Sequence, residues 1–543
     1  MKPMNMKHAF LKTRLLLGTM VAVASLTATA HAAAPGITGS TFNLTAQPAF
    51  LNQPDGSAVY SWGYGCNGAP SGFVPTAIKN ATCPSMQIPG PTLIVTEGQT
   101  ITVNLTNNLP AAAGNTSILF PGFQVATSCP TSTAAGAPQQ GLLTCEAAPG
   151  GTVTYTFTAS SPGTRSYYSG TQGDLQVEMG LYGAIIVLPA NVPAACTRGL
   201  PAANVQVEGA HGESDFRLAA SAYDHDKTCY DREYLFQFSE MDANIHNQAL
   251  VQVTAIQNCT PSTTVTCPTQ LSVPTEPYHP SYFMINGRSM PDDMDGNYAA
   301  EYPHQPYNGN PHMHPGEQVL LRVIGQGRWQ HPFHEHANHV RILARDGNLI
   351  TNASDPESLA GLLMFTTTTT PGQAFDGIFY FTGRGLNWDM YAHNPNSADP
   401  LAKLPCSPDA NGYYTVNSPS PAPVSAINYY EWCQDHNKPL QVSPIGDVAA
   451  GGPATLPDPN ILTNGNWYSG SPYLGPDATT RATGTTSDYQ PANTQANPAN
   501  ERGWAFMWHS HNEREITTNN LFPGGMMMMM LVDSREFVID EQN

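Results

Sequence analysis

A weak internal repeat places the tightest limit on how this chain can fold. Near residue 90 the chain reads PGPTLIVTEGQTITVNLTNNL, then TSILFPG, GGTVTYTF, GTRSYYSG and GLYGAIIV. Near residue 315 it reads PGEQVLLRVIGQG, then HPFHEHANH, PGQAFDGIFYF, GWAFMWHSH and FPGGMMMMMLV. The elements follow in the same order, so two copies of one domain are the simplest explanation. We expect the first copy over residues 41–190, a linker over 191–228 and the second copy over 229–535.

Both copies are expected to be β-structure. Short runs rich in β-branched residues, with Gly, Pro or Asn close by, recur at 92–95, 100–105, 153–157 and 184–187. The chain holds 47 Gly and 48 Pro with only 12% charged residues, which is typical of extracellular proteins with many turns. No long helical period stands out. The sequence therefore predicts an all-β protein built from two β-sandwich domains.

A long segment interrupts the second copy. Residues 394–500 are rich in Pro, Gly, Ser, Thr and Asn and contain Cys406 and Cys433. We interpret the segment as a loop-rich insertion between strands, with a disulfide between these two cysteines as one way to staple it. Loops of this length are uncommon inside a domain, so either a functional role or a further small domain would account for it.

The first 32 residues resemble a secretory signal peptide. An apolar, small-residue stretch over 15–30 precedes an A-x-A cleavage site at Ala30-His31-Ala32. The basic residues before the stretch are Lys2, Lys7, Lys12 and Arg14. A membrane anchor is the alternative, but the stretch is short for a span and no second apolar stretch follows. We expect a periplasmic or extracellular protein with no membrane span after cleavage.

Ten cysteines, an even number behind a signal peptide, predict disulfides. Sequence does not determine their connectivity, and we expect neighbours to pair because short loops close at the lowest entropic cost. No CxxC pair supports a zinc ribbon or a thioredoxin-like site. A free cysteine that binds copper is the competing interpretation, but none of the ten lies beside a histidine pair.

The formal charge of −19 argues against a nucleic-acid partner, which would require a basic face, and against an anionic membrane surface. Without the four signal cations, the mature chain would be more acidic still. Such a charge favours cationic partners, metal ions among them, and it also favours solubility.

Two H-x-H pairs are the strongest chemical signal, namely His334 with His336 and His509 with His511. Residues i and i+2 of a strand share a face, so each pair presents two imidazoles side by side. Two such strands would place up to four nitrogen ligands around one pocket, and copper ranks highest among divalent ions at such a site. The alternative is that these histidines are packed or exposed without a metal. A third H-x-H, His312 with His314, is interpreted as a loop feature.

The histidine segments resemble the multicopper oxidase family. HPFHEHANHVRILARDG resembles its H-P-x-H-x-H motif, which implies a type 1 copper ligand at His331 and trinuclear cluster ligands at His334 and His336. MWHSHNEREITTNNLFPGGMM resembles its H-C-H or H-S-H motif, which implies cluster ligands at His509 and His511. PGPTLIVTEGQTITVNLTNNL and DREYLFQFSEMD also look like that family. The resemblance implies two cupredoxin-like Greek-key sandwiches and copper as the cofactor.

Most of the family's other copper ligands are missing. The family's T-S-I-H-W-H-G stands here as TSILFPG over 116–122, and its G-T-x-x-Y-H-S-H as GTRSYYSG over 163–170, so all four histidines are lost. In the H-C-H-x-x-x-H alignment, Ser510 replaces the cysteine and Glu515 the distal histidine. Serine cannot supply a thiolate, so no blue type 1 site is expected. In the H-S-H alignment the serine is normal.

Two kinds of function remain open. One is a copper-dependent oxidoreductase with a mononuclear or dinuclear site; the other is a non-catalytic metal-binding or structural protein on a cupredoxin scaffold. A homo-oligomer in which a partner subunit supplies missing ligands is a further alternative.

Met526 to Met530 would either bind copper(I) or fill the core. Asp389 and Glu515 are either acid–base or supporting groups or solvated surface residues. A cupin is a rival interpretation of H-x-H on a β-protein, but this chain lacks the glutamate that the cupin pattern requires a few residues after His336. The sequence does not indicate a substrate.

Overall fold

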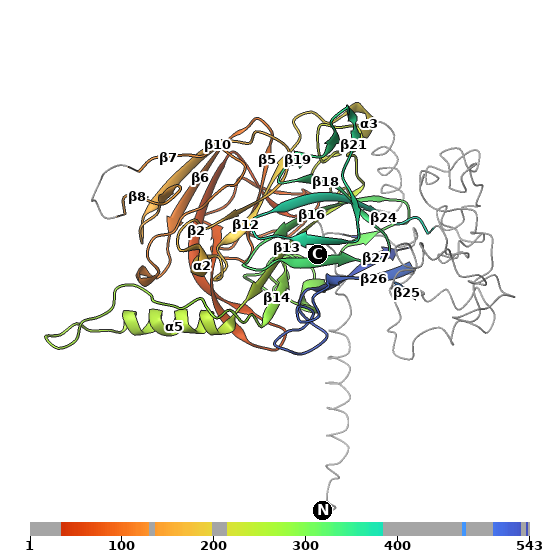
Figure 1. The fold of residues 1–543 in the computed structure, drawn as a ribbon. Coiled ribbons are helices and arrows are strands. Elements are labelled where there is room, and N and C mark those ends of the chain that lie inside the picture. Colours follow the sequence, from red (N-terminus) through yellow and green to blue (C-terminus); the bar gives the residue numbers. More distant parts are fainter. Residues whose placement is uncertain are drawn as a thin grey trace, which may run out of the picture.

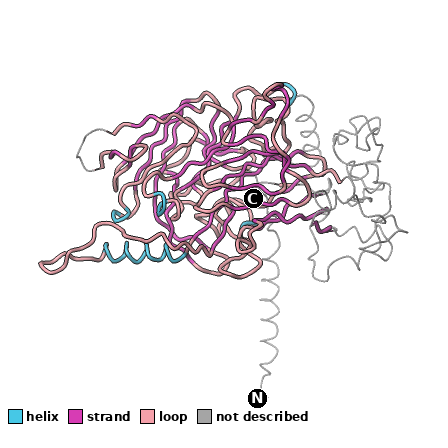
Figure 2. The backbone as a smooth tube through the Cα atoms, viewed as in Figure 1, coloured by secondary structure: helices cyan, strands magenta, loops and turns pink. Residues whose placement is uncertain are grey.

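Two β-sandwiches follow one another along the chain in the computed structural model (Figure 1). The structure describes residues 34–129, 136–197, 214–383, 470–473, 503–533 and 539–540. Strands and loops dominate these residues, and helices are few (Figure 2). The predicted all-β, cupredoxin-like fold class is confirmed. The predicted signal peptide and most of the 394–500 segment lie outside the described residues, and the exact domain boundaries stay a prediction.

The first sandwich packs two five-stranded sheets around one core. Alternation is clearest in β10 (Thr152–Thr158), where Val153, Tyr155 and Phe157 face the core and the threonines between them face outward. One sheet has the order β11 (Gly163–Tyr168), β12 (Tyr182–Leu188), β5 (Gly90–Thr96), β1 (Gly36–Thr38) and β4 (Gly72–Val74). The other has the order β3 (Ala58–Cys66), β2 (Thr41–Asn52), β6 (Thr100–Asn107), β10 and β7 (Ala126–Thr127).

The second sandwich carries the histidine pairs. Its first sheet has the order β14 (Tyr282–Ile285), β13 (Arg232–Met241), β16 (Gln318–Gly325), β24 (Ala374–Tyr380), β18 (Val340–Arg345) and β19 (Asn348–Leu349), with β22 (Leu363–Met364) beside β18. Its second sheet has the order β15 (His312–Met313), β27 (Met527–Asp533), β26 (Gly503–Ser510), β17 (His331–Glu335) and β23 (Thr366–Thr369), with β25 (Gly470–Tyr473) beside β26. The two H-x-H segments therefore belong to neighbouring strands.

Short elements complete the described part of the chain. Two small hairpins pair β8 (Gln139–Gln140) with β9 (Cys145–Glu146) and β20 (Thr351–Asn352) with β21 (Asp355–Leu359). The short helices are α2 (Gly173–Gln176), α3 (Ala194–Thr197), η1 (Ala111–Ala113) and η2 (Asp292–Met294). None of the described helices is long and apolar enough to cross a membrane.

One longer helix, α5 (Ala243–Gln257), was not predicted. Its N-cap Asp242 accepts a hydrogen bond from the backbone N–H of Asn244 at 2.9 Å. Its buried residues Ile245, Ala249 and Val253 lie at helical spacing, but apolar residues such as the exposed Val251 also occupy its other side. The apolar face therefore does not stand out in the sequence. His246 fixes the helix on the first sandwich, because its Nδ1 lies 2.6 Å from the carbonyl oxygen of Tyr60.

Buried polar groups join the two sandwiches. The Asp376 carboxylate accepts hydrogen bonds from Thr164 Oγ1 at 2.6 Å and from the Tyr223 hydroxyl at 2.5 Å. Arg322 Nη1 lies 3.8 Å from the same carboxylate, and its Nε donates to Glu233 at 2.8 Å. Thr164 belongs to the first sandwich and Asp376 to the second, so this network holds β11 against β16 and β24.

Four disulfides link neighbouring cysteines, as predicted. They are Cys66–Cys83, Cys129–Cys145, Cys196–Cys229 and Cys259–Cys267, and the described part of the chain has no free cysteine. Cys406 and Cys433 lie outside the described residues.

Candidate metal centre

The pairing of β17 with β26 brings the two H-x-H segments together. In this antiparallel ladder His334 lies opposite His509, and Phe333 lies opposite Ser510. Directly paired residues share a face of the sheet, so the four histidines of the two pairs lie on one side. Phe333 and Trp508 point to the other side, into the core of the second sandwich.

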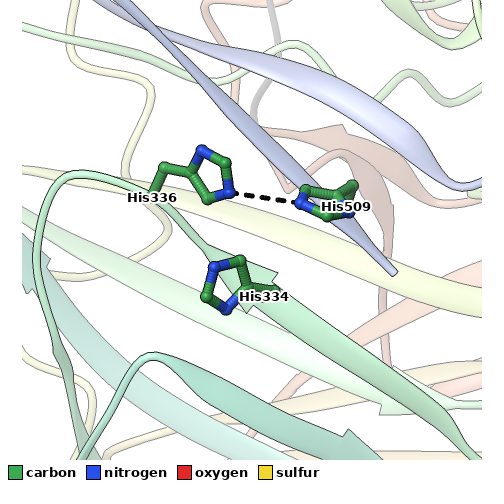
Figure 3. Close-up of side chains that lie close together, drawn as sticks. All are labelled: His334, His336 and His509. Carbon is green, nitrogen blue, oxygen red and sulfur yellow. Dashed lines mark hydrogen bonds between the residues drawn. The ribbon is translucent and has the colours of Figure 1, made fainter. Parts of the chain in front are cut away.

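Three of these histidines form a compact group, with one potential ligand atom each and all within 4.8 Å of one another (Figure 3). They are His334, His336 and His509, at 1%, 4% and 5% exposure. The Nε2 atoms of His336 and His509 are 3.2 Å apart, and the His334 ring centroid lies 4.8 Å from that of His336 and 5.5 Å from that of His509.

Neighbouring groups orient two of the imidazoles toward the group. His509 Nδ1 lies 2.7 Å from the Ser510 carbonyl oxygen, which can only accept, so Nδ1 carries the proton and Nε2 has the lone pair in the neutral ring. His334 Nδ1 lies 2.6 Å from Thr366 Oγ1, which fixes that ring. Such supporting contacts are typical of metal-ligating histidines.

Burial keeps the imidazoles in the form that binds metals. Burial, followed by the nearby His509 and His511 rings, lowers the pKa of His334 to about 4. Burial also lowers the pKa of His509. Both rings are therefore neutral at neutral pH, and neutral imidazole is the ligating form.

The residues present fit a bound metal ion. Two nitrogens that each lie about 2.0 Å from an ion in tetrahedral geometry are about 3.3 Å apart, close to the spacing of the two Nε2 atoms. An all-imidazole set suits copper or zinc rather than calcium or magnesium. His334, His336 and His509 would hold the ion.

His511 lies at the rim of this group. Its ring centroid is 4.8 Å from that of His334 and 5.5 Å from that of His509. Its side chain is 50% exposed, and its Nδ1 lies 3.8 Å from a carboxylate oxygen of Glu513. Of the four histidines of the two pairs, His511 is therefore the one that solvent reaches.

The structure does not bring His331 into the group. Its Nδ1 lies 2.9 Å from Glu515 Oε2 and its Nε2 lies 2.8 Å from Glu240 Oε2, and all three side chains are buried. Both ring nitrogens therefore donate to carboxylates, and neither keeps a lone pair for a metal. Despite opposing burial, these two carboxylates raise the pKa of His331 to about 9, so the ring is a buried imidazolium.

Glu515 lies at the position where the family resemblance implies a type 1 copper. His331 Nδ1 and Ser510 Oγ both hydrogen-bond to the same oxygen, Glu515 Oε2. Asn512 Nδ2 holds the other oxygen at 2.8 Å. The residues in the positions of two type 1 ligands, His331 and Ser510, thus converge on a carboxylate oxygen.

First-sandwich residues at or beside the lost histidine positions have partners of their own. Leu119 pairs with Tyr168 through backbone hydrogen bonds, and Tyr168 lines a small cavity with Gln326 and Arg328. Phe120 packs in the first core against Phe157, with ring centroids 4.8 Å apart.

The interpretation of the third H-x-H as a loop feature was wrong for His312 but holds for His314, which follows the strand. His312 lies in β15, which pairs in parallel with β27, and His312 and His314 are both buried. His312 Nδ1 lies 2.6 Å from Asp533 Oδ2, and His314 Nδ1 lies 3.1 Å from the Asp533 carbonyl oxygen. Burial and these contacts with Asp533, the last residue of β27, hold the two rings in place.

Sequence reasoning missed two contributors, Glu240 and Thr366. Glu240 stands in DREYLFQFSEMD, a segment that had already been singled out for its resemblance to the family. That resemblance was the signal from which its burial could have been predicted. Thr366 lies in a run of five threonines, where nothing distinguishes one from the next. Asp389, the other acidic residue considered, lies outside the described residues.

The described residues form two β-sandwiches with a group of histidines on the second, and comparisons with known proteins show what the chain resembles. Residues 76–192 match the family model described as multicopper oxidase. An L-ascorbate oxidase from Brassica rapa subsp. pekinensis is 41% identical over 101 residues, which are 19% of this chain and 16% of that protein. The chain is therefore similar to multicopper oxidases over about a fifth of its length. Multicopper oxidases bind copper.

Solved structures that match the chain are more distant in sequence. The multicopper oxidase mgLAC is 13% identical, with 91% of this chain and 86% of that chain covered and a TM-score of 0.41. The blue copper oxidase from Nitrosomonas europaea is 14% identical, with 91% and 85% covered and a TM-score of 0.41. A copper nitrite reductase from the same organism is 17% identical, with 63% and 84% covered and a TM-score of 0.35.

The imidazolium of His331 predicts a pH-dependent stability. Its pKa in the folded protein, about 9, is above the ordinary 6.5, so its stabilisation is complete below pH 6.5 and is lost as the pH rises through 9. From this group alone, the free energy of unfolding of the metal-free protein should fall by about 3 kcal/mol over that window. Urea unfolding at pH 6 to 10 measures it. Glu515→Gln removes one carboxylate and should flatten the slope; equal slopes in both proteins would refute the assignment.

The convergence on Glu515 predicts that a blue copper site can be rebuilt. The double substitution S510C/E515H would complete a two-histidine, one-thiolate set with His331. We expect intense blue absorption after copper loading of this variant and none in the parent. E515H alone, which lacks the thiolate, is the matched control. A blue band in the parent, or a colourless double variant that binds copper beside His331, would contradict the assignment.

Proposed function

We propose that this protein binds one copper ion in a mononuclear centre of imidazoles on the outer face of the second sandwich. The observation that carries the proposal is the 3.2 Å approach of two Nε2 atoms, with a third buried imidazole beside them. Copper is preferred over zinc because it ranks higher at nitrogen sites and because homologues bind copper.

The proposed centre is smaller than a complete multicopper oxidase apparatus. Ser510 stands at the position that the family resemblance assigns to the electron-entry cysteine, and its hydroxyl is hydrogen-bonded to Glu515. The four first-sandwich histidine positions hold Leu119, Pro121, Tyr168 and Gly170. Without these ligands, neither a type 1 copper nor a trinuclear cluster has a complete ligand set.

A copper-dependent oxidoreductase is the second candidate function, and the exposure of His511 favours it. Copper would supply one-electron chemistry at this centre. Because no type 1 ligand set relays electrons from a distance, a reductant would have to reach the centre directly. His511 is half-exposed beside the buried group, so the rim on its side offers the access that such a reaction needs.

Copper loading of histidine variants tests the centre. The parent should bind about one copper per chain tightly, and H334Q/H336Q should lose that binding because two of the three buried ligands are gone. Elemental analysis after removal of loosely bound metal, with electron paramagnetic resonance of the bound copper(II), gives the result.

The matched control for these variants is H225A/H279A. It removes two histidines that lie outside the cluster, in segments away from β17 and β26. It should bind copper as the parent does. The centre is wrong if both double variants keep copper. Cooperative unfolding of H334Q/H336Q on heating shows that its loss of copper comes from the missing ligands and not from misfolding.

We also propose that the protein is exported to the periplasm or the cell exterior. Four disulfides in the described residues support an oxidising compartment. Mass spectrometry of protein from its native compartment should give an N-terminus near Ala33 and no alkylated thiols. An uncleaved N-terminus with several free thiols would place the protein in a reducing compartment instead.

A further inference from the structure

A row of methionines continues the imidazole face of the second sandwich. In the pairing of β26 with β27, Met527 lies opposite His509 and Met529 lies opposite Met507. Paired residues share a face, and so do residues two apart on one strand. Met507, Met527 and Met529 therefore lie on the same side of the sheet as His509. The two strands run side by side at the blue end of the chain (Figure 1).

Core packing accounts for only half of the methionine run. Met526, Met528 and Met530 are fully buried members of the second core. The alternate positions face away from that core. In β12, the strand that the repeat matches with β27, the face turned away from the first core holds Ala184 and Ile186, which are apolar and buried. What distinguishes the same face of β27 and β26 is that its apolar side chains are thioethers, which can also bind a metal.

These thioethers are close enough to one another and to His509 to share a ligand. Directly opposed residues in an antiparallel pair have Cβ atoms about 4.5–5.5 Å apart, and the unbranched methionine side chain adapts to irregular spaces. Met527 is 4% exposed, whereas Met507 and Met529 are partly exposed. Met294 Sδ lies 3.4 Å from the Met529 backbone nitrogen, but its side chain packs against the second core and is not part of this face. By strand register, the three thioethers therefore extend from partly exposed positions to the residue opposite His509.

We propose that Met507, Met527 and Met529 form a copper(I)-binding subsite that adjoins the imidazole centre at His509. Soft thioether ligands select copper(I), whereas imidazoles also hold copper(II), so the two parts of the face differ in the oxidation state that they prefer. The proposal rests on the proposed function, because the imidazole centre is the site that the subsite adjoins. The thioethers themselves would bind copper(I) without the imidazoles.

Competition for copper(I) tests the subsite on the full-length, disulfide-bonded protein. Under anaerobic conditions with ascorbate, bicinchoninate competes with the protein for copper(I). M507L/M527L/M529L should weaken copper(I) binding by roughly tenfold or more, because leucine keeps the volume and loses the sulfur. Its copper(II) stoichiometry should match the parent's. X-ray absorption of the copper(I) protein should show sulfur neighbours that this variant lacks.

The core pair M528L/M530L is the control, since it changes the same strand on the other face and should keep the parent's copper(I) affinity. Equal copper(I) affinity in the parent and M507L/M527L/M529L, or nitrogen and oxygen neighbours only in the parent, would overturn the subsite. H334Q/H336Q separates the two proposals. If the parent binds copper(II) but the thioether variant changes nothing, only the subsite fails. If copper(II) binding is absent while copper(I) still finds sulfur, only the imidazole centre fails.

Discussion

The antiparallel pairing of β17 with β26 is the interaction on which the rest of the second sandwich depends. One register places His334 beside His509 on the outer face and Phe333 and Trp508 in the core. A slip by one residue would move each side chain to the opposite face, burying imidazoles in an apolar core and exposing large aromatic side chains. The stability of the aromatic core therefore also fixes the geometry of the imidazoles.

The two ends of β17 show how surroundings decide what a histidine does. At one end His331 lies between two carboxylates, and it is held as a cation that cannot bind a metal. At the other end His334 faces further imidazoles and a threonine hydroxyl, so burial has no opposing carboxylate and the ring stays neutral. Both side chains are buried, and the partner groups alone account for the difference.

Sequence reasoning predicted what depends on local period and failed where distant segments meet. The H-x-H spacing predicted a shared face, and short cysteine separations predicted the four described disulfides. The partners of His331, in contrast, stand 91 and 184 residues away, and no local pattern indicates that they converge. Sequence also could not predict on which face of the sheet each methionine of the run lies, because that depends on the register of β27 with β26.

The buried Glu240–His331–Glu515 network occupies, without a metal, the position at which the family resemblance implies a type 1 copper. A buried imidazolium between carboxylates costs desolvation, and the loss of one partner would leave an uncompensated charge, so the network persists only when complete. Its hydrogen bonds also reach the Arg328 and Trp329 backbone N–H groups through Glu240, at 2.6 and 2.8 Å. This end of β17 is thus tied down by protein groups alone. The imidazoles at the other end can consequently gain or lose an ion without the loss of the strand that carries them.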